Sequence, residues 1–177
     1  MKYTTIAAAA FCATTQAYQL NQAEAEIVGV PINELTTVQY NTIIAGIAYG
    51  FVDKEGLTLI ETCIADAKPE AVLAYEALGS LKHGDFATGL TEVAEIVKAL
   101  PPLLTACKAI GPDIVTLEEY IANLAAQPDI EAYIRHDITR HILALTKDLA
   151  LAKTYYSNAN YWEFGMELGT MLAIATQ

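Results

Sequence analysis

The residues of this sequence that could carry out chemistry lie close together in the segment RHDITRHILALTKD. His141 follows Asp137 by four residues, and Asp148 follows His141 by seven. Both spacings are close to whole turns of an α-helix, so one edge of a helix would present a carboxylate, an imidazole and a second carboxylate. His136 is expected on the opposite side of that helix. Because carboxylates and imidazoles are metal ligands, the segment is a candidate site for weak binding of a divalent cation.

Further carboxylates could complete such a site, because Glu163 and Glu167 are one helical turn apart near the end of the chain. The alternative is that Asp137 and Asp148 are solvated charges and that Asp137 forms an ordinary surface pair with His141. The first interpretation leads to the hypothesis of a small metal-assisted enzyme that uses His141 and nearby carboxylates. The sequence leaves both interpretations open.

Other kinds of catalysis have little basis in the sequence. The chain has only two serines, Ser80 and Ser157, and lacks the G-x-S-x-G motif of serine hydrolases. Phosphate-binding loops, dinucleotide-binding glycine motifs, H-E-x-x-H, C-x-x-C and EF-hand loops are absent as well. We therefore expect no cofactor and favour a role that is not enzymatic.

The first 17 residues, MKYTTIAAAAFCATTQA, have the layout of a secretory signal peptide. Lys2 precedes an apolar stretch, and small residues lead up to a cleavage site between Ala17 and Tyr18. The stretch is about half of the ~20 residues that a helix needs to cross a bilayer, so we expect no membrane span. The alternative is a first helix of the mature fold. We expect a secreted protein, or one in the secretory-pathway lumen, with residues 18–177 forming a single domain.

The composition is acidic. The chain has 21 Asp and Glu against 10 Lys and Arg, a formal net charge of −11. Loss of residues 1–17 removes one of these bases and none of the acids, which leaves −12. Such a surface repels the phosphates of nucleic acids and anionic lipid headgroups, so neither is an expected partner.

The cysteine count favours one disulfide. Signal cleavage removes Cys12, and Cys63 and Cys107 remain. In an oxidising compartment these two thiols most simply pair with each other. Two buried free thiols, or a bridge between two chains, are the alternatives.

Apolar residues recur at helical spacing along the whole chain, while strand-like alternation and hairpin turns are absent. The sequence therefore predicts an all-α fold, a compact bundle of about seven to nine helices with one disulfide. Pro101 and Pro102 interrupt a helical pattern after Leu100, so we expect a helix to end there and the segment with Cys107 to turn away. The expected helices cover residues 22–29, 33–52, 55–66, 69–81, 85–99, 101–110, 113–126, 129–157 and 160–175.

The longest expected helix, 129–157, has apolar residues at spacings of three and four. We expect it to be the central core helix and to be covered over more than half of its circumference. The stripe consists of Ile130, Ile134, Ile138, Ile142, Leu145, Leu149, Ala152 and Tyr156.

Two pairs of glycines with the same four-residue step are candidate helix-packing residues. Gly46 and Gly50 lie in IIAGIAYGF, and Gly165 and Gly169 lie in the last expected helix. Where side chains are missing, another helix can approach closely. The pairs predict either one tight internal crossing or the seam of a dimer.

The segments IIAGIAYGF, GDFATG, LPPLLTAC and NYWEFGMELG, together with Cys63, resemble an uncharacterised family of small secreted all-α proteins from protists. The resemblance covers most of residues 18–177, and its motifs are packing motifs. It implies the fold and secretion, and it carries no activity and no catalytic residues.

Three hypotheses about function follow. The first is a non-enzymatic structural or interaction protein of the secretory pathway that binds a protein partner or itself, suggested by an apolar content of 54% and the enclosed last helix. The second is a carrier for a small apolar ligand in a cavity between helices, which the same apolar surplus would line. The third is the metal-assisted enzyme.

Overall fold

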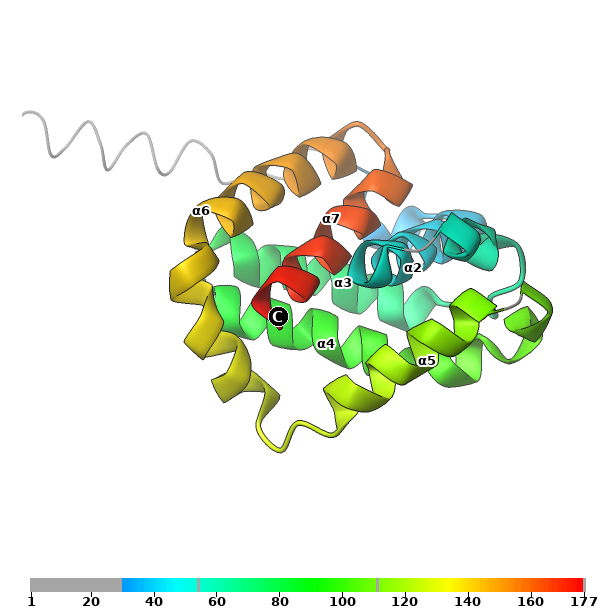
Figure 1. The fold of residues 1–177 in the computed structure, drawn as a ribbon. Helices are drawn as coiled ribbons and strands as arrows, with labels where there is room; N and C mark the ends of the chain where they lie inside the picture. Colours follow the sequence, from blue (N-terminus) through cyan, green and yellow to red (C-terminus); the bar gives the residue numbers. More distant parts are fainter. Residues whose placement is uncertain (1–29, 54, 111, 177) are drawn as a thin grey trace, which may run out of the picture.

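The computed structural model describes residues 30–53, 55–110 and 112–176. They form helices joined by short turns, with no strand among them, which confirms the all-α fold class (Figure 1). The predicted signal peptide and the predicted helix 22–29 lie outside the described residues. The elements are η1 (Ile32–Glu34), α2 (Thr37–Val52), η2 (Glu55–Thr62), α3 (Lys68–Lys82), α4 (Phe86–Leu103), η3 (Thr105–Ile110), α5 (Pro112–Ala125), α6 (Ile130–Ser157) and α7 (Tyr161–Ala175), where η marks a 3-10 helix.

Local hydrogen bonds fix where the helices begin. The Thr36 hydroxyl accepts a bond from the Gln39 amide N–H, and the Gln39 side chain accepts one from the Thr36 N–H, so α2 begins with a capping box. α6 begins after Asp129, whose carboxylate accepts a 2.9 Å bond from the Ala132 N–H. These side chains satisfy backbone donors that have no partner within the helix.

The two prolines do not break α4, and that prediction was wrong. The helix runs through Pro101 and Pro102 to Leu103. The proline ring fixes φ near −65°, which a helix tolerates, and the N–H donors that the rings lack are missing only from its last turn. A 3.1 Å bond from the Leu104 N–H to the Leu100 carbonyl oxygen closes this turn. The chain therefore turns away after Leu103 and not after Leu100.

The disulfide predicted from the cysteine count is present. The sulfur atoms of Cys63 and Cys107 lie 1.98 Å apart. Cys63 follows η2, a 3-10 helix that occupies most of the segment predicted as a helix at 55–66, and the fully buried Cys107 lies in η3. A 3.3 Å hydrogen bond from the Ala65 N–H to the Leu103 carbonyl oxygen joins the same two segments as the disulfide. The disulfide thus fastens the segment after α2 to the segment that leads into α5.

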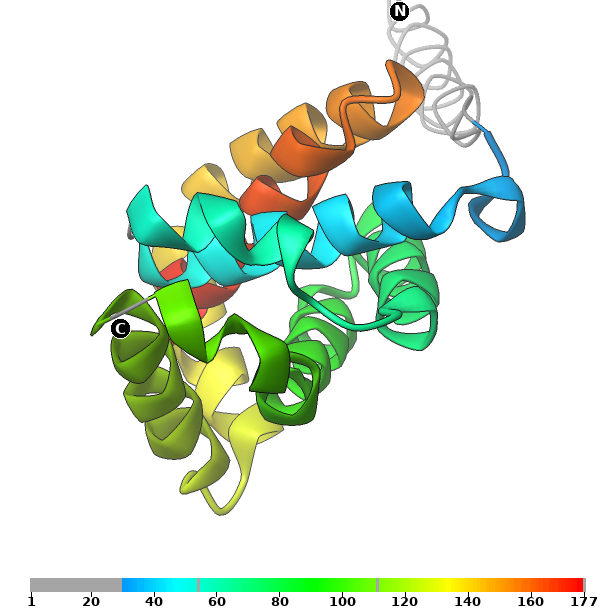
Figure 2. The ribbon, with the colours of Figure 1, turned by 90° about the vertical axis from the view of Figure 1, so that its right-hand side faces the viewer.

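α2 and α7 make the most extensive helix contact of the fold and lie side by side in two views (Figures 1 and 2). A Cβ atom added to Gly165 would overlap the carbonyl oxygen of Ile43, and one added to Gly50 would overlap that of Met166. The two backbones therefore touch at the glycines. Gly46 and Gly169 face the partner backbone in the same way, so all four predicted packing glycines belong to one internal crossing.

The order of these contacts also gives the direction of the two helices. Gly46 lies against Trp162 and Gly165, while Gly50, one turn later in α2, lies against Met166. Residue numbers rise together in both helices, so α2 and α7 run parallel. Their carboxyl ends consequently emerge at the same end of the molecule.

α6 is less fully buried than its apolar pattern predicts. It has 28 residues, whereas α7, on which the chain folds back, has 15. Figure 1 shows α6 arching along one side of the molecule. The middle of the helix meets solvent, where Leu143 is 85% exposed and Ile142 is 39% exposed. The prediction that this helix is covered over more than half of its circumference is therefore wrong for its middle.

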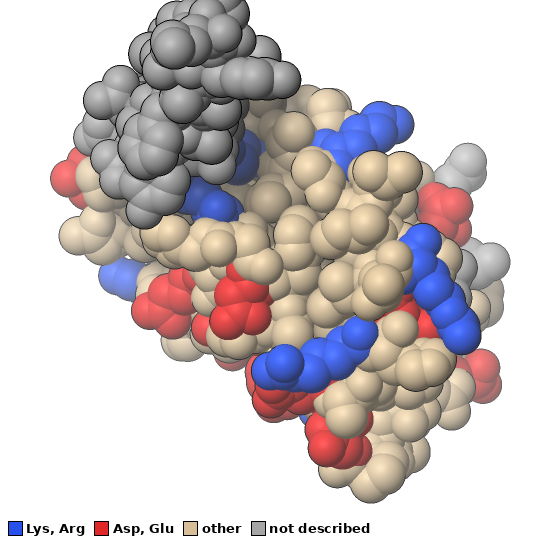
Figure 3. Space-filling view, turned by 90° about the vertical axis from the view of Figure 1, so that its left-hand side faces the viewer, with Lys and Arg blue, Asp and Glu red and all other residues tan. Residues whose placement is uncertain are grey.

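The side of the molecule seen in Figure 3 is not uniformly acidic, although the chain carries a net charge of −11. Lys and Arg side chains lie there beside Asp and Glu, with uncharged surface between them. Within the described part of the chain, no helix combines the length and apolar character needed to cross a bilayer.

Candidate functional site

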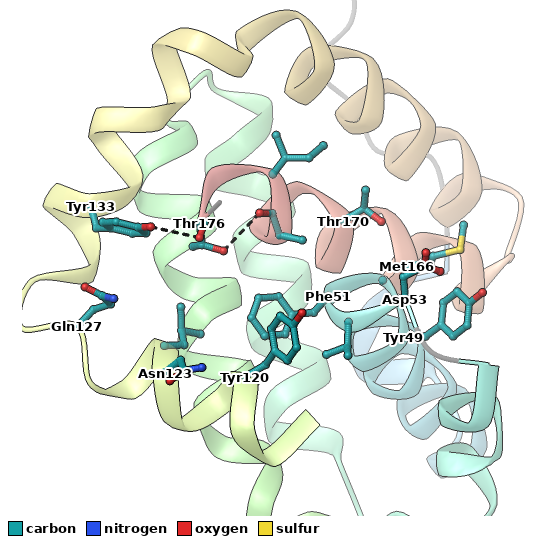
Figure 4. Close-up of a pocket in the computed structure, with 15 residues that line it drawn as sticks. Tyr49, Phe51, Asp53, Tyr120, Asn123, Gln127, Tyr133, Met166, Thr170 and Thr176 are labelled. Atoms are coloured by element: carbon teal, nitrogen blue, oxygen red, sulfur yellow. Dashed lines mark hydrogen bonds between the residues drawn. The ribbon is translucent and has the colours of Figure 1, made fainter. Parts of the chain in front are cut away.

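A pocket of about 610 Å³ opens between the carboxyl ends of α2, α5 and α7 and the beginning of α6 (Figure 4). Cavities that bind small molecules typically measure roughly 300–1,000 Å³, so the volume suits such a ligand. The residues that line it are Tyr49, Gly50, Phe51, Val52, Asp53, Tyr120, Asn123, Leu124, Gln127, Tyr133, Met166, Thr170, Ala173, Ile174 and Thr176.

The helix packing explains why the pocket forms at this place. Because α2 and α7 run parallel, their last turns end together. α2 and its cap supply the segment 49–53 of the wall, and the end of α7 supplies Ala173, Ile174 and Thr176. α5 adds its last turns, and Tyr133 comes from the first turns of α6. On α7, Met166, Thr170 and Ala173 have the spacing of one helix face, and that face forms one side of the pocket.

Aromatic rings dominate one part of the wall. Phe51 and Tyr120 meet edge to face, with ring centroids 6.1 Å apart, and lie together in Figure 4. Tyr49 rests on Trp162, with centroids 5.6 Å apart. Phe51 is buried, whereas Tyr120 is 48% exposed, so the ring pair reaches from the core to the mouth of the pocket. Such rings offer apolar area and accessible π faces to a ligand.

Polar groups are placed around these rings. The Tyr133 hydroxyl donates a 3.3 Å bond to the carbonyl oxygen of Thr176, which links α6 to the end of α7 (Figure 4). The amides of Asn123 and Gln127 and the hydroxyl of Thr170 also line the pocket. An apolar wall with a few hydrogen-bonding groups is the usual composition of a small-molecule site.

The segment that the sequence singled out for chemistry lies outside this pocket. Asp137 is 5% exposed, so its interpretation as a solvated charge was wrong. Its carboxylate Oδ1 lies 3.3 Å from an Arg140 guanidinium nitrogen and 3.2 Å from His136 Nδ1. His136 therefore reaches Asp137 although we expected it on the opposite side, and Asp137 is held by these neighbours and not by His141.

Asp148 on α6 and Glu167 on α7 are also buried, at 9% and 8% exposure, and the negative charge of Asp148 acts on Glu167. Burial raises the pKa of Asp148, and the charge of Lys147 partly opposes this. Burial raises the pKa of Glu167 too, and the negative charge of Asp148 adds to the shift. Both carboxylates thus destabilise the folded chain when they are ionised.

We expect Glu167→Gln to raise the free energy of unfolding at pH 7 by about 0.5–1 kcal/mol, because the amide removes a poorly solvated charge. The raised pKa means that the folded chain binds the proton more tightly than the unfolded chain. Stability therefore falls as pH rises from the unfolded-state pKa through the folded-state pKa. Urea unfolding at pH 7 and pH 5 measures the effect, and the advantage of the variant should shrink at the lower pH.

The matched control for this change is Glu163→Gln, one turn earlier on the same helix and only partly buried. It removes the same charge from the same helix and should change stability less. Equal gains from the two variants would show that relief of net charge, and not burial of Glu167, is responsible.

The metal hypothesis finds no geometric support. Across residues 30–53, 55–110 and 112–176, no group of three or more His, Cys, Asp or Glu side chains is placed to hold a metal ion. Asp137, His141 and Asp148 follow one another along α6. Glu167 on α7 is close enough to feel the charge of Asp148, but no third ligand joins these two carboxylates among the described residues.

Comparisons of the chain with protein-family models, with curated proteins and with solved structures find no match. The resemblance to small secreted proteins of protists therefore stays a prediction. The pocket must be interpreted from its own geometry.

No pattern in the sequence predicts the residues of the pocket. Tyr49, Tyr120 and Tyr133 come from three segments that are far apart in the chain, so no local spacing connects them. All three tyrosines are near helix ends, and this was the available signal. Helix ends can meet in many ways, however. Only the parallel arrangement of α2 and α7 brings these three helix ends together.

Proposed function

We propose that this protein binds a small, largely apolar molecule in the pocket between α2, α5, α6 and α7 and that it acts as a carrier or receptor without catalysing a reaction. The observation that carries the proposal is the pocket itself, with about 610 Å³ of space and a wall of aromatic and aliphatic side chains. Hydroxyl and amide groups around the rings would fix the orientation of the ligand. Of the three hypotheses from the sequence, this geometry fits the carrier.

We propose further that binding takes place outside the cell or in the lumen of the secretory pathway. Two features support this location: the signal-peptide pattern of residues 1–17, and the disulfide between Cys63 and Cys107. Disulfides persist mainly in oxidising compartments.

One observation favours the structural or interaction role as a second candidate. Leu143 and Ile142 are exposed neighbours on the middle of α6. A partner helix or a second copy could cover them. Single exposed apolar residues are common on monomeric proteins, however, so we place ligand binding first.

The neutral dye phenylnaphthylamine, whose fluorescence rises in apolar surroundings, tests the proposed function. We expect saturable binding of one dye per chain to the folded protein. Thr170→Trp should weaken this binding at least tenfold, because the indole would occupy space that Thr170 borders on the face of α7. A fluorescence titration of each variant gives the dissociation constants.

The matched control is Leu143→Trp, which adds an indole at a side chain that is 85% exposed and remote from the pocket lining. It should bind the dye like the unchanged protein. Melting curves establish that both variants are folded. Equal affinities of Thr170→Trp and Leu143→Trp for the dye would contradict the proposal.

A further inference from the structure

We propose that the pocket selects a small organic cation, a protonated amine or quaternary ammonium group on an apolar body, with Asp53 as its counter-ion. This inference rests on the proposed function and names its ligand class. It starts from the charges of the wall. Asp53 carries the only carboxylate among the described lining residues, and none of them is Lys, Arg or His. An anionic ligand would meet no opposite charge there, whereas a cation would meet one.

The backbone adds to this negative potential. α2, α5 and α7 end at Val52, Ala125 and Ala175, and the last turn of each contributes to the wall. A helix carboxyl end bears a partial negative charge because its last carbonyl oxygens lack partners within the helix. The amino end of α6, which also lies nearby, is capped by the Asp129 carboxylate. The helix ends at this pocket therefore favour a positive ligand.

The aromatic rings provide a second, independent means of binding a cation. The π faces of Phe51, Tyr120 and Tyr49 carry the negative part of the ring quadrupole, and an ammonium group over such a face is attracted to it. The ring pair of Phe51 and Tyr120 reaches the mouth of the pocket, so a cation can approach it from solvent. The same rings would cover the apolar body of the ligand.

Asp53 is held in place by the backbone. It caps the end of α2 in the left-handed conformation, with φ 54° and ψ 56°, and its N–H donates a 2.6 Å bond to the Tyr49 carbonyl oxygen. Asp and Asn adopt this conformation more readily than most residues. Asp53→Asn therefore removes the charge while it keeps the cap.

The test compares ligands of one shape and different charge by displacement of phenylnaphthylamine. Phenethyltrimethylammonium carries the cation, and its isostere with carbon in place of nitrogen is neutral. We expect the cation to bind at least tenfold more tightly than the isostere. Asp53→Asn should weaken cation binding about tenfold and leave binding of the isostere unchanged.

The control variant is Glu76→Gln, which removes one exposed acid on α3 outside the pocket lining. Like Asp53→Asn, it removes one negative charge, but it should not change cation binding. If the isostere binds as tightly as the cation, or if Asp53→Asn and Glu76→Gln behave alike, the inference is overturned while the proposed function stands. If neither compound displaces the dye and binding of the dye itself does not saturate, both the inference and the proposed function fail.

Discussion

Gly165→Ala should lower the free energy of unfolding by about 3 kcal/mol or more, the upper end of the range for an overfilled core. The added methyl group would overlap the carbonyl oxygen of Ile43 and lie 3.1 Å from the backbone nitrogen of Ile47. Both are backbone atoms of α2, so no side chain can rotate away. The helices would have to separate along the most extensive contact of the fold. Urea unfolding followed by circular dichroism measures the loss.

Gly79→Ala is the matched control, because it makes the same chemical change inside another helix. Apart from the glycine itself, its two chain neighbours and the adjacent backbone of its own helix, no atom lies within 4 Å of the position where its Cβ would stand. Alanine stabilises a helix interior by roughly 0.5–1 kcal/mol relative to glycine, so this variant should be slightly more stable than the unchanged protein. A Gly165→Ala protein as stable as Gly79→Ala would contradict the close crossing of α2 and α7.

This crossing could be predicted from the sequence because its signal is local. Gly46 and Gly50 are one helical turn apart, as are Gly165 and Gly169, and each pair marks one bare helix face. The sequence alone did not decide between an internal crossing and a dimer seam. That choice depends on which surfaces meet after folding.

The burial of the two acids of α6 was not predicted, although their spacing in the sequence indicates it. Asp137 follows Ile134 by three residues, and Asp148 follows Leu145 by three, so both acids are in phase with buried positions. The predicted stripe contains apolar residues only, so it leaves out both acids. Conversely, Ile142 belongs to the stripe and is exposed at the middle of α6. Periodicity gives the face of a helix, whereas the packing of the neighbouring helices decides how much of that face is covered.

Replacing both Cys63 and Cys107 by serine should lower the free energy of unfolding by about 3–4 kcal/mol. The two residues are 44 positions apart, and the disulfide closes a loop between them. This loop lowers the conformational entropy of the unfolded state, so removing the bond stabilises the unfolded chain. Thermal unfolding should show a melting temperature lower by roughly 10 °C, since about 1 kcal/mol corresponds to 2–4 °C for a chain of this size.

The loss should extend to the pocket, because the disulfide fastens η3, and η3 leads directly into α5, which carries Tyr120 and Asn123. Without the bond, α5 is tied to the core by packing alone, and dye binding should weaken even where the chain is still folded. The unchanged protein after reduction is the control for the serine substitutions and should match the double variant in both stability and affinity. A reduced protein that melts at the temperature of the oxidised one would show that the bond adds nothing to the fold. Retained dye affinity in a destabilised double variant would instead show that α5 holds its side of the pocket without the disulfide.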